Sequence, residues 1–276
     1  TGVQSTTAVG NGQQAFVGLS GNFGAIKAGR VNSNALDAWG VGSVFGTAIG
    51  SGYSVNGGIY TRYSANATTG AAITASATSQ SAPTRFNGAV RYESPVFNGF
   101  SGSVLVVPKG ADTGVQSVTD IGLKYSNGPL NVLYANQEIK QDGAMSAGGF
   151  IPTASGSGLA AGEKSKLNIV AANYTMGAAT VYGAYWTEKQ AAAVDAKSYM
   201  LGAKYVIGAT TLMASVGNNN DKLAANADRK IYGIGADYAL SKRTALYARY
   251  DNRDGNSTSA ADDKTKRTAI GVRHTF

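Results

Sequence analysis

The sequence predicts an all-β fold, a transmembrane antiparallel β-barrel formed as a single domain over residues 1–276. Apolar and polar side chains alternate along segments of about 10–12 residues, a length that fits a tilted bilayer crossing better than the shorter strands of soluble sheets. Short turns and long connections alternate between these segments, as in outer-membrane barrels. Charged residues are 14% of the chain, whereas an average soluble domain has roughly 25%.

The predicted strands can be placed from this alternation. Tight turns rich in Asn and Gly, such as 126–129, link strands in pairs, because Asn and Gly tolerate positive φ. Thirteen strands are expected, at 13–22, 24–31, 84–94, 99–108, 117–126, 130–140, 165–175, 178–189, 197–207, 209–219, 229–240, 243–254 and 265–276. With thirteen hairpin-linked strands the first and last run parallel, so these strands alone do not close an antiparallel barrel.

Charges on the clearer strands lie on the face opposite the apolar side chains. In the last strand Ile270 and Val272 share one face, and Arg267 and Arg273 share the other. An arginine on the lipid face at mid-membrane costs about 2–4 kcal/mol, so the charged face is expected to line a lumen. The same alternation predicts that Lys204, Arg249, Asp251 and Arg273 face the lumen, and that Phe86, Val90 and Tyr92 lie opposite Arg85, Asn87, Arg91 and Glu93.

Several functions are disfavoured by composition. Without Cys the chain has no disulfide, thiolate metal site or cysteine nucleophile, and its single histidine, His274, forms no multi-histidine metal site. The net charge of +8 is diffuse, so it favours small anions over nucleic acid. No stretch is apolar enough for a transmembrane helix, and the N-terminus lacks the features of a signal peptide. We expect no enzyme activity, no cofactor and no metal.

Three segments carry a resemblance to a known family. Gln14-Ala-Phe-Val-Gly-Leu-Ser-Gly-Asn-Phe-Gly24, Ala89-Val-Arg-Tyr-Glu-Ser-Pro-Val-Phe-Asn-Gly-Phe100 and the ending Gly271-Val-Arg-His-Thr-Phe276 resemble the general porins of β-proteobacteria. The resemblance implies a barrel of sixteen strands, of which about three would precede the thirteen predicted here. It also implies a homotrimer in the outer membrane of a Gram-negative bacterium, and a C-terminal Phe276 that signals to the outer-membrane assembly machinery.

The resemblance also implies a pore constriction. In the family the third loop folds into the lumen, and the connection 32–83 occupies its place. The acids Asp37 and Glu93 would face the arginines Arg30, Arg62, Arg85 and Arg91 there. Arg30 shares a face with Ile26 and Ala28, so we expect it to turn inward near Gly29.

Simpler roles remain open for these residues. Arg85 and Arg91 would then be scattered lumen charges, and Arg62 a solvated loop residue. Asp37 would begin a turn or cap a short helix near Asn34, a role compatible with the constriction.

The predicted function is passive diffusion of small hydrophilic solutes and ions, with a preference for anions. The expected partners are outer-membrane lipid, lipopolysaccharide and the solutes themselves. The alternative is a non-channel outer-membrane barrel, either an adhesin or a structural protein, which would show the same strand pattern. A lipid hydrolase would need a nucleophile and a base, and His274 lies on the outward face at the chain end.

Overall fold

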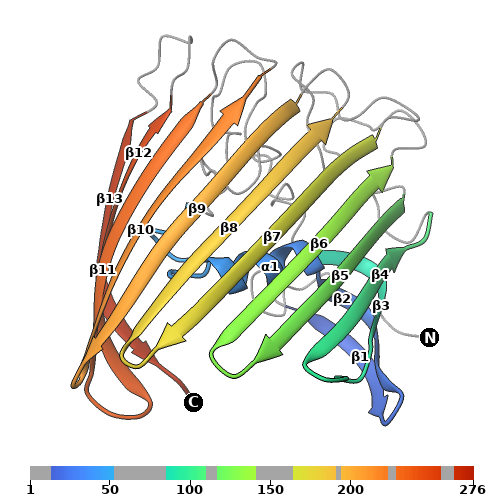
Figure 1. Ribbon diagram of the computed structural model, residues 1–276, viewed down its shortest axis with the longest axis horizontal. Coiled ribbons are helices and arrows are strands. Elements are labelled where there is room, and N and C mark those ends of the chain that lie inside the picture. The colour runs from blue at the N-terminus through green and yellow to red at the C-terminus, as the bar shows by residue number, and fades with distance from the viewer. Residues whose placement is uncertain are drawn as a thin grey trace.

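Most of the residues that the structure describes belong to a single antiparallel sheet. The computed structural model describes residues 14–52, 85–109, 117–140, 164–190, 194–222, 228–255 and 264–276. Thirteen strands pair in chain order, each with the next, and one helix follows the second strand (Figure 1). The elements are β1 (Ala15–Gly21), β2 (Gly24–Asn32), α1 (Asn34–Gly42), β3 (Arg85–Glu93), β4 (Phe100–Val107), β5 (Ser117–Asn127), β6 (Leu130–Lys140), β7 (Lys164–Met176), β8 (Ala179–Gln190), β9 (Val194–Ile207), β10 (Thr210–Asp221), β11 (Arg229–Ala239), β12 (Thr244–Gly255) and β13 (Thr265–His274).

The prediction of thirteen strands is confirmed, with boundaries close to those expected. The tight turns also agree, since Gly128 adopts a φ of 53° in the Asn127-Gly128 link between β5 and β6. The strands β1 and β13 form the two edges of the sheet, which is not closed. Among the described residues no helix has the length and apolar character needed to cross a bilayer.

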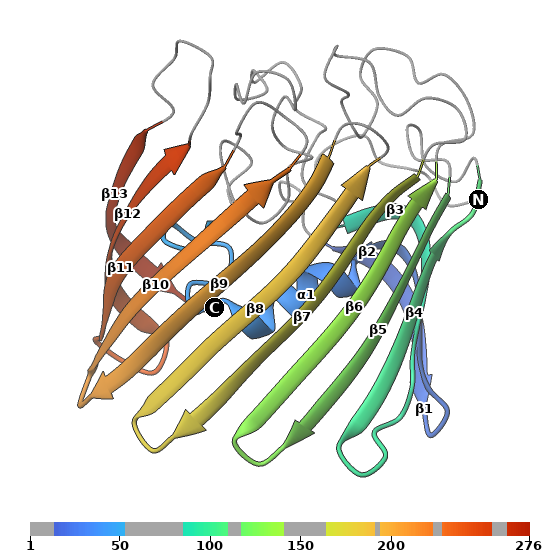
Figure 2. The same cartoon turned by 45° about the horizontal axis from the view of Figure 1, so that its top comes forward.

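The two faces of the sheet differ in chemistry. The sheet curves around α1, and we call the face that α1 packs against the inner face (Figure 2). On the outer face apolar side chains are exposed, for example Ile270 (82%) and Leu201 (54%). Arg249 and Asp251 lie on the inner face, where residues 45–50 contact them. The outer face therefore suits lipid, and the inner face carries the charges.

The sequence analysis placed Phe86 on the wrong face of the sheet. Val90 and Tyr92 are each 41% exposed on the outer face, but Phe86 is fully buried in a cluster with Val31 and Leu105. The register between β2 and β3 shifts at this point, because Gly29 pairs with Ala89 but Val31 pairs with Phe86. One extra residue in β3 therefore interrupts the alternation, as a β-bulge does.

Candidate functional site

The helix α1 begins with a conventional cap. The Leu36 backbone N–H donates to Ser33 Oγ at 3.0 Å, and the Asp37 N–H donates to the Ser33 carbonyl oxygen at 3.2 Å. Asp37 lies in the first turn, where a negative charge interacts favourably with the helix dipole. A short helix therefore forms near Asn34, as the sequence allowed, but Ser33 and not Asp37 is its cap.

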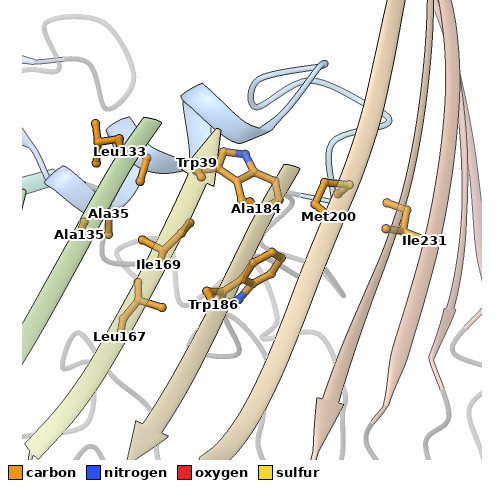
Figure 3. Close-up of a cluster of buried hydrophobic side chains, with 12 residues drawn as sticks. Ala35, Trp39, Leu133, Ala135, Leu167, Ile169, Ala184, Trp186, Met200 and Ile231 are labelled. Atoms are coloured by element: carbon orange, nitrogen blue, oxygen red, sulfur yellow. The ribbon is translucent and has the colours of Figure 1, made fainter. Parts of the chain in front are cut away.

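An apolar cluster attaches α1 to the inner face of β6–β9 and extends to β11. Trp39 is fully buried and meets Trp186 edge to face, with ring centroids 5.4 Å apart (Figure 3). The small residues Ala35 and Ala38 let the helix approach the sheet closely. The strand residues of this cluster are Leu133, Ala135, Leu167, Ile169, Ala171, Ala184, Trp186, Met200 and Ile231. Part of the inner face is therefore apolar, because α1 covers it.

Hydrogen bonds fix the start of the helix to β5. The Asn34 backbone N–H donates to Asp120 Oδ2 at 2.8 Å, and the Asn34 side-chain amide donates to the Asp120 carbonyl oxygen at 2.9 Å. Gln137 on β6 also donates to Asp120 Oδ2, at 3.2 Å. Both Asn34 and Asp120 are fully buried. A buried carboxylate with several donors is strongly held, so this contact fixes where the chain leaves β2.

The chain after α1 crosses to the opposite part of the sheet. The Trp39 indole N–H donates to the Gly46 carbonyl oxygen at 2.8 Å, which folds the segment back on the helix. The Gly50 N–H then donates to Asp251 Oδ2 on β12 at 3.0 Å, and Ser215 Oγ on β10 donates to the Gly50 carbonyl oxygen at 2.6 Å. Residues 34–52 thus extend over the inner face from β5 to β12.

Two glycines of α1 provide a matched test of this attachment. A Cβ on Gly42 would lie 2.7 Å from Ala184 Cβ and 2.8 Å from the Gly183 carbonyl oxygen, whereas a Cβ on Gly40 would meet nothing within 4 Å. We expect Gly42→Ala to lower the thermal unfolding temperature, because the added Cβ has no room beside Ala184 on β8. Gly40→Ala is expected to stabilise the helix by about 0.5–1 kcal/mol. Equal effects of the two changes in thermal melts would contradict the observed packing.

Charged residues from three elements meet beside α1. Asp37 Oδ2 lies 2.7 Å from Arg91 Nη2, and Arg91 Nε lies 3.0 Å from Glu93 Oε1. Glu93 also pairs with Lys27 Nζ at 2.8 Å. The register explains this contact, because Lys27 on β2 lies opposite Arg91 on β3. We call Lys27, Asp37, Arg91 and Glu93 the β2–β3 charge cluster.

A cavity of about 740 Å³ borders this cluster. Its charged lining consists of Asp37, Arg85, Arg91, Glu93 and Lys124. Thus the structure brings together four of the six residues expected at a constriction. Arg30 is not among the lining residues, and its Nη1 donates to Asn87 Oδ1 at 2.8 Å. Arg62 lies outside the described residues.

A second group of charges lies on the inner face of β11–β13. Asp237 pairs with Arg249 and, at 3.4 Å, with Arg273. Asp251 is fully buried and pairs with Arg267 and, at 3.8 Å, with Arg253. We call these six residues the β11–β13 arginine group. Its arginines outnumber its aspartates, so the group is positive. The remaining charge expected on the lumen side, Lys204, has its Nζ 5.9 Å from the centre of the Tyr182 ring.

The other singled-out residues lie near the C-terminus. His274 is exposed, and its Nδ1 is 2.9 Å from the Thr244 hydroxyl. Phe276 is fully exposed, and its ring packs edge to face with His274 at 4.9 Å. Within the described ranges no three His, Cys, Asp or Glu side chains are grouped as a metal site would require.

Sequence reasoning missed Lys27, Trp39 and Asp120 as residues of this site. Lys27 would have been found by pairing segments 24–31 and 84–94, which places it opposite Arg91. Asp120 would have stood out as the acid on the predicted strand 117–126, although its partner Asn34 lies 86 residues away. The sequence gives no strong signal for Trp39, which is only an aromatic residue next to the segment that could form a short helix.

Comparison with known proteins identifies the family. The model of the Gram-negative porin family matches residues 2–258. This chain belongs to the Gram-negative porin family. It is similar to the major outer membrane protein P.IB of Neisseria lactamica, at 29% identity over 129 residues. That alignment spans 45% of this chain and 31% of the relative, so the chain matches less than a third of the relative's length.

Solved structures show the same fold. The anion-selective porin of Comamonas acidovorans matches with a TM-score of 0.72 at 20% identity, over 95% of this chain and 77% of that one. The trimer form of OmpT from Vibrio cholerae matches with a TM-score of 0.62 at 17% identity, over 94% of this chain and 79% of that one. This porin is thus a multi-pass β-barrel protein of the outer membrane.

Proposed function

We propose that this porin is a passive diffusion channel for small hydrophilic solutes and ions, with a preference for anions. The observation that carries the proposal is the course of residues 34–52 over the inner face, with the β2–β3 charge cluster and the cavity beside them. A segment held against the inner face narrows the space that the sheet encloses. Fixed charges at such a narrowing bias which ions enter.

The proposed constriction belongs to the connection 32–83. Asp37, Arg85, Arg91 and Glu93 remain its proposed residues because they line the cavity. Lys27 does not line the cavity, but it is added because its ion pair holds Glu93, which does. Arg30 is left out because it does not line the cavity and its Nη1 donates to Asn87 Oδ1, which does not line it either. Asp37 and Arg91 touch directly instead of facing each other across open space. We therefore propose that the β11–β13 arginine group also contributes to the electric field across the pore.

The anion preference rests on the inner charges. Around the cavity and on β11–β13 the basic side chains outnumber the acidic ones. The likeness to an anion-selective porin is consistent with this proposal. An open lumen with excess positive charge concentrates small anions and repels cations.

We also propose that the protein acts as a homotrimer, as the trimer form of OmpT does. The exposed C-terminal Phe276 is proposed as the signal for the outer-membrane assembly machinery. A fully exposed side chain is accessible to a binding partner.

Ion selectivity tests the proposal directly. In planar bilayers under a tenfold KCl gradient, we expect the sign of the reversal potential to indicate that chloride is preferred. The permeability of chloride relative to potassium should be roughly two or more. Raising the salt should reduce the ratio, because mobile ions screen the fixed charges. A cation-selective pore would contradict the anion preference. A protein that inserts without conducting would contradict the channel and favour a non-channel barrel.

A further inference from the structure

A second cavity lies on the inner face, between the segment that follows α1 and the last two strands. Its volume is about 490 Å³, which is in the range of small-molecule sites. Ala48 and Ile49 line it from that segment, and Tyr247, Arg249 and Arg273 line it from β12 and β13. It shares no lining residue with the cavity beside the β2–β3 charge cluster. The inner face of this porin therefore has a separate place where a solute fits.

Arg249 is held on several sides in the wall of this cavity. Its Nη1 donates to backbone carbonyl oxygens of β11 and β12, each at 2.9 Å, and its Nη2 pairs with Asp237. Its guanidinium carbon lies 5.6 Å from the centre of the Phe45 ring and 5.6 Å from the centre of the Tyr247 ring. Cations are attracted to aromatic rings at such distances. Arg249 is therefore bound mainly by the protein itself, and it orients the Tyr247 ring.

Two glycines on the neighbouring strands leave room for this arrangement. Gly235 on β11 lies opposite Arg249, and a Cβ there would lie 2.7 Å from Arg249 Cδ. Gly271 on β13 lies opposite Tyr247, and a Cβ there would lie 2.6 Å from the Tyr247 hydroxyl oxygen. The Tyr247 side chain thus lies across β13 at Gly271, where any larger residue would displace it. The sequence of all three strands supports one position of this ring.

Arg273 supplies a positive charge that a solute can reach. Its side chain is 65% exposed, and its Nη2 lies 3.4 Å from Asp237 Oδ2. The other oxygen of Asp237 pairs with Arg249. Two arginines thus share one carboxylate, so the three side chains together are positive. Because a guanidinium has five N–H donors and can bind a carboxylate through two of them, Arg273 retains donors for an anion in the cavity.

The remaining inner walls of the cavity are apolar. Ala48 and the half-buried Ile49 lie on one side, and Ala269 and the Tyr247 ring belong to the sheet. A solute that fills this space needs an apolar body as well as an anionic group. An aromatic carboxylate has both, since its ring can stack on Tyr247 while its carboxylate reaches Arg273. Chloride or phosphate would leave the apolar walls unfilled.

The cavity lies near the periplasmic end of the barrel. The chain ends beside the short turn between β11 and β12, because the Thr275 N–H donates to the Arg243 carbonyl oxygen at 2.9 Å (Figure 1). Short turns of outer-membrane barrels are periplasmic. Val272 and His274 also border the cavity, from the other side of the edge strand β13. A strand paired with that edge would extend the sheet sideways, so Arg273 would still face the lumen.

We propose that this cavity is a binding site for aromatic carboxylates at the periplasmic exit of the channel. The carboxylate pairs with Arg273, and the ring stacks on Tyr247 and contacts Ile49. The site rests on the proposed channel function for its access, and it distinguishes among the small anions that the channel admits. Binding is weak and reversible, because a solute held tightly would not leave the pore.

Binding is measured on the folded full chain in detergent by saturation-transfer NMR titration. The probes are benzoate, acetate, which lacks the ring, and benzamide, which lacks the charge. We expect benzoate to bind about tenfold more tightly than either. Arg273→Gln should weaken benzoate binding about tenfold, because a charged hydrogen-bond donor is lost. Tyr247→Leu should weaken benzoate binding about fivefold and leave acetate binding unchanged.

The matched control is Lys204→Gln. It also removes one positive charge from the inner face, but Lys204 lies on β9 beside Tyr182 and does not line this cavity. Its benzoate affinity should stay within about twofold of that of the unaltered protein, because salt screens a distant charge. Equal losses in Arg273→Gln and Lys204→Gln would overturn the proposal, since the effect would then come from the total inner charge.

The comparison of probes needs no variant and so does not depend on refolding. Benzoate that binds no more tightly than acetate would overturn the proposal, and benzamide that binds as tightly as benzoate would overturn the role of Arg273. In bilayer recordings benzoate should lower the KCl conductance, and less so in Arg273→Gln. A protein that binds benzoate without conducting would count against the channel and leave the site in place. A protein that conducts but does not distinguish the probes would count against the site alone.

Discussion

Replacing Trp39 with alanine is expected to increase the single-channel conductance and its current noise. The Trp39 side chain is fully buried against Trp186, and its indole N–H is bonded to Gly46. Removing a buried tryptophan side chain costs about 3–5 kcal/mol. That loss would fall mainly on the attachment of α1, because the strands keep their own hydrogen bonds. A loosely held α1 would narrow the pore less and would fluctuate in position. Bilayer recordings would show this as a larger conductance and a noisier current.

The control for this change is Trp39→Phe. Phenylalanine keeps most of the aromatic contact with Trp186 but cannot donate to the Gly46 carbonyl oxygen. We therefore expect an effect well below that of alanine. Heat-modified gel mobility and circular dichroism should show an intact barrel in both variants. Unchanged conductance and noise in a folded Trp39→Ala protein would show that α1 is held without Trp39.

Much of the fold could be predicted because strand alternation is local. Ile270 and Val272 are separated by one residue, and their shared face is visible in the sequence without knowing any partner. The Asn127-Gly128 turn is equally local, since a positive φ at Gly128 is required within the link itself. The thirteen strands follow from signals of this kind.

The rest depends on contacts between distant parts of the chain. The burial of Phe86 results from one extra residue in β3, where Gly88 adopts a φ of 58°, and strict alternation over 84–94 leaves out a bulge at this glycine. Leu167 and Ile169 are apolar although they lie on the inner face, and only their contact with α1, which covers them, explains this. Likewise, the contact of Asn34 with Asp120 fixes the helix, but the two residues come from separate segments. Alternation alone predicts neither the bulge nor the covered patch.

The net charge of +8 also has a different meaning once the faces are known. Exposed lysines such as Lys166, Lys189 and Lys230 lie on the outer face, so they contribute to the total without lining the lumen. The charges relevant to conduction are those on the inner face, such as Arg91 and Arg249. Selectivity must therefore be tested at individual inner residues.

Neutralising Asp37 and neutralising Arg91 are expected to shift ion selectivity in opposite directions. The two side chains form an ion pair of 2.7 Å at the edge of the cavity. Asp37→Asn leaves one more positive charge there, so chloride permeability relative to potassium should rise. Arg91→Gln leaves Asp37 and Glu93 in excess, so that ratio should fall. A unit charge at about 4 Å from an ion in water is worth about 1 kcal/mol, which limits each shift to about fivefold.

The double variant Asp37→Asn/Arg91→Gln decides whether the two charges act as a pair. It restores the net charge of the cluster, so its reversal potential should return close to that of the unaltered protein. Asp254→Asn is the control, since Asp254 is exposed and lies opposite Lys230 on the outer face of the sheet. If Asp254→Asn shifts selectivity as much as Asp37→Asn, the effect comes from total charge and not from the cluster. If neither single variant shifts it, Asp37 and Arg91 hold α1 in place without acting on the ions that pass.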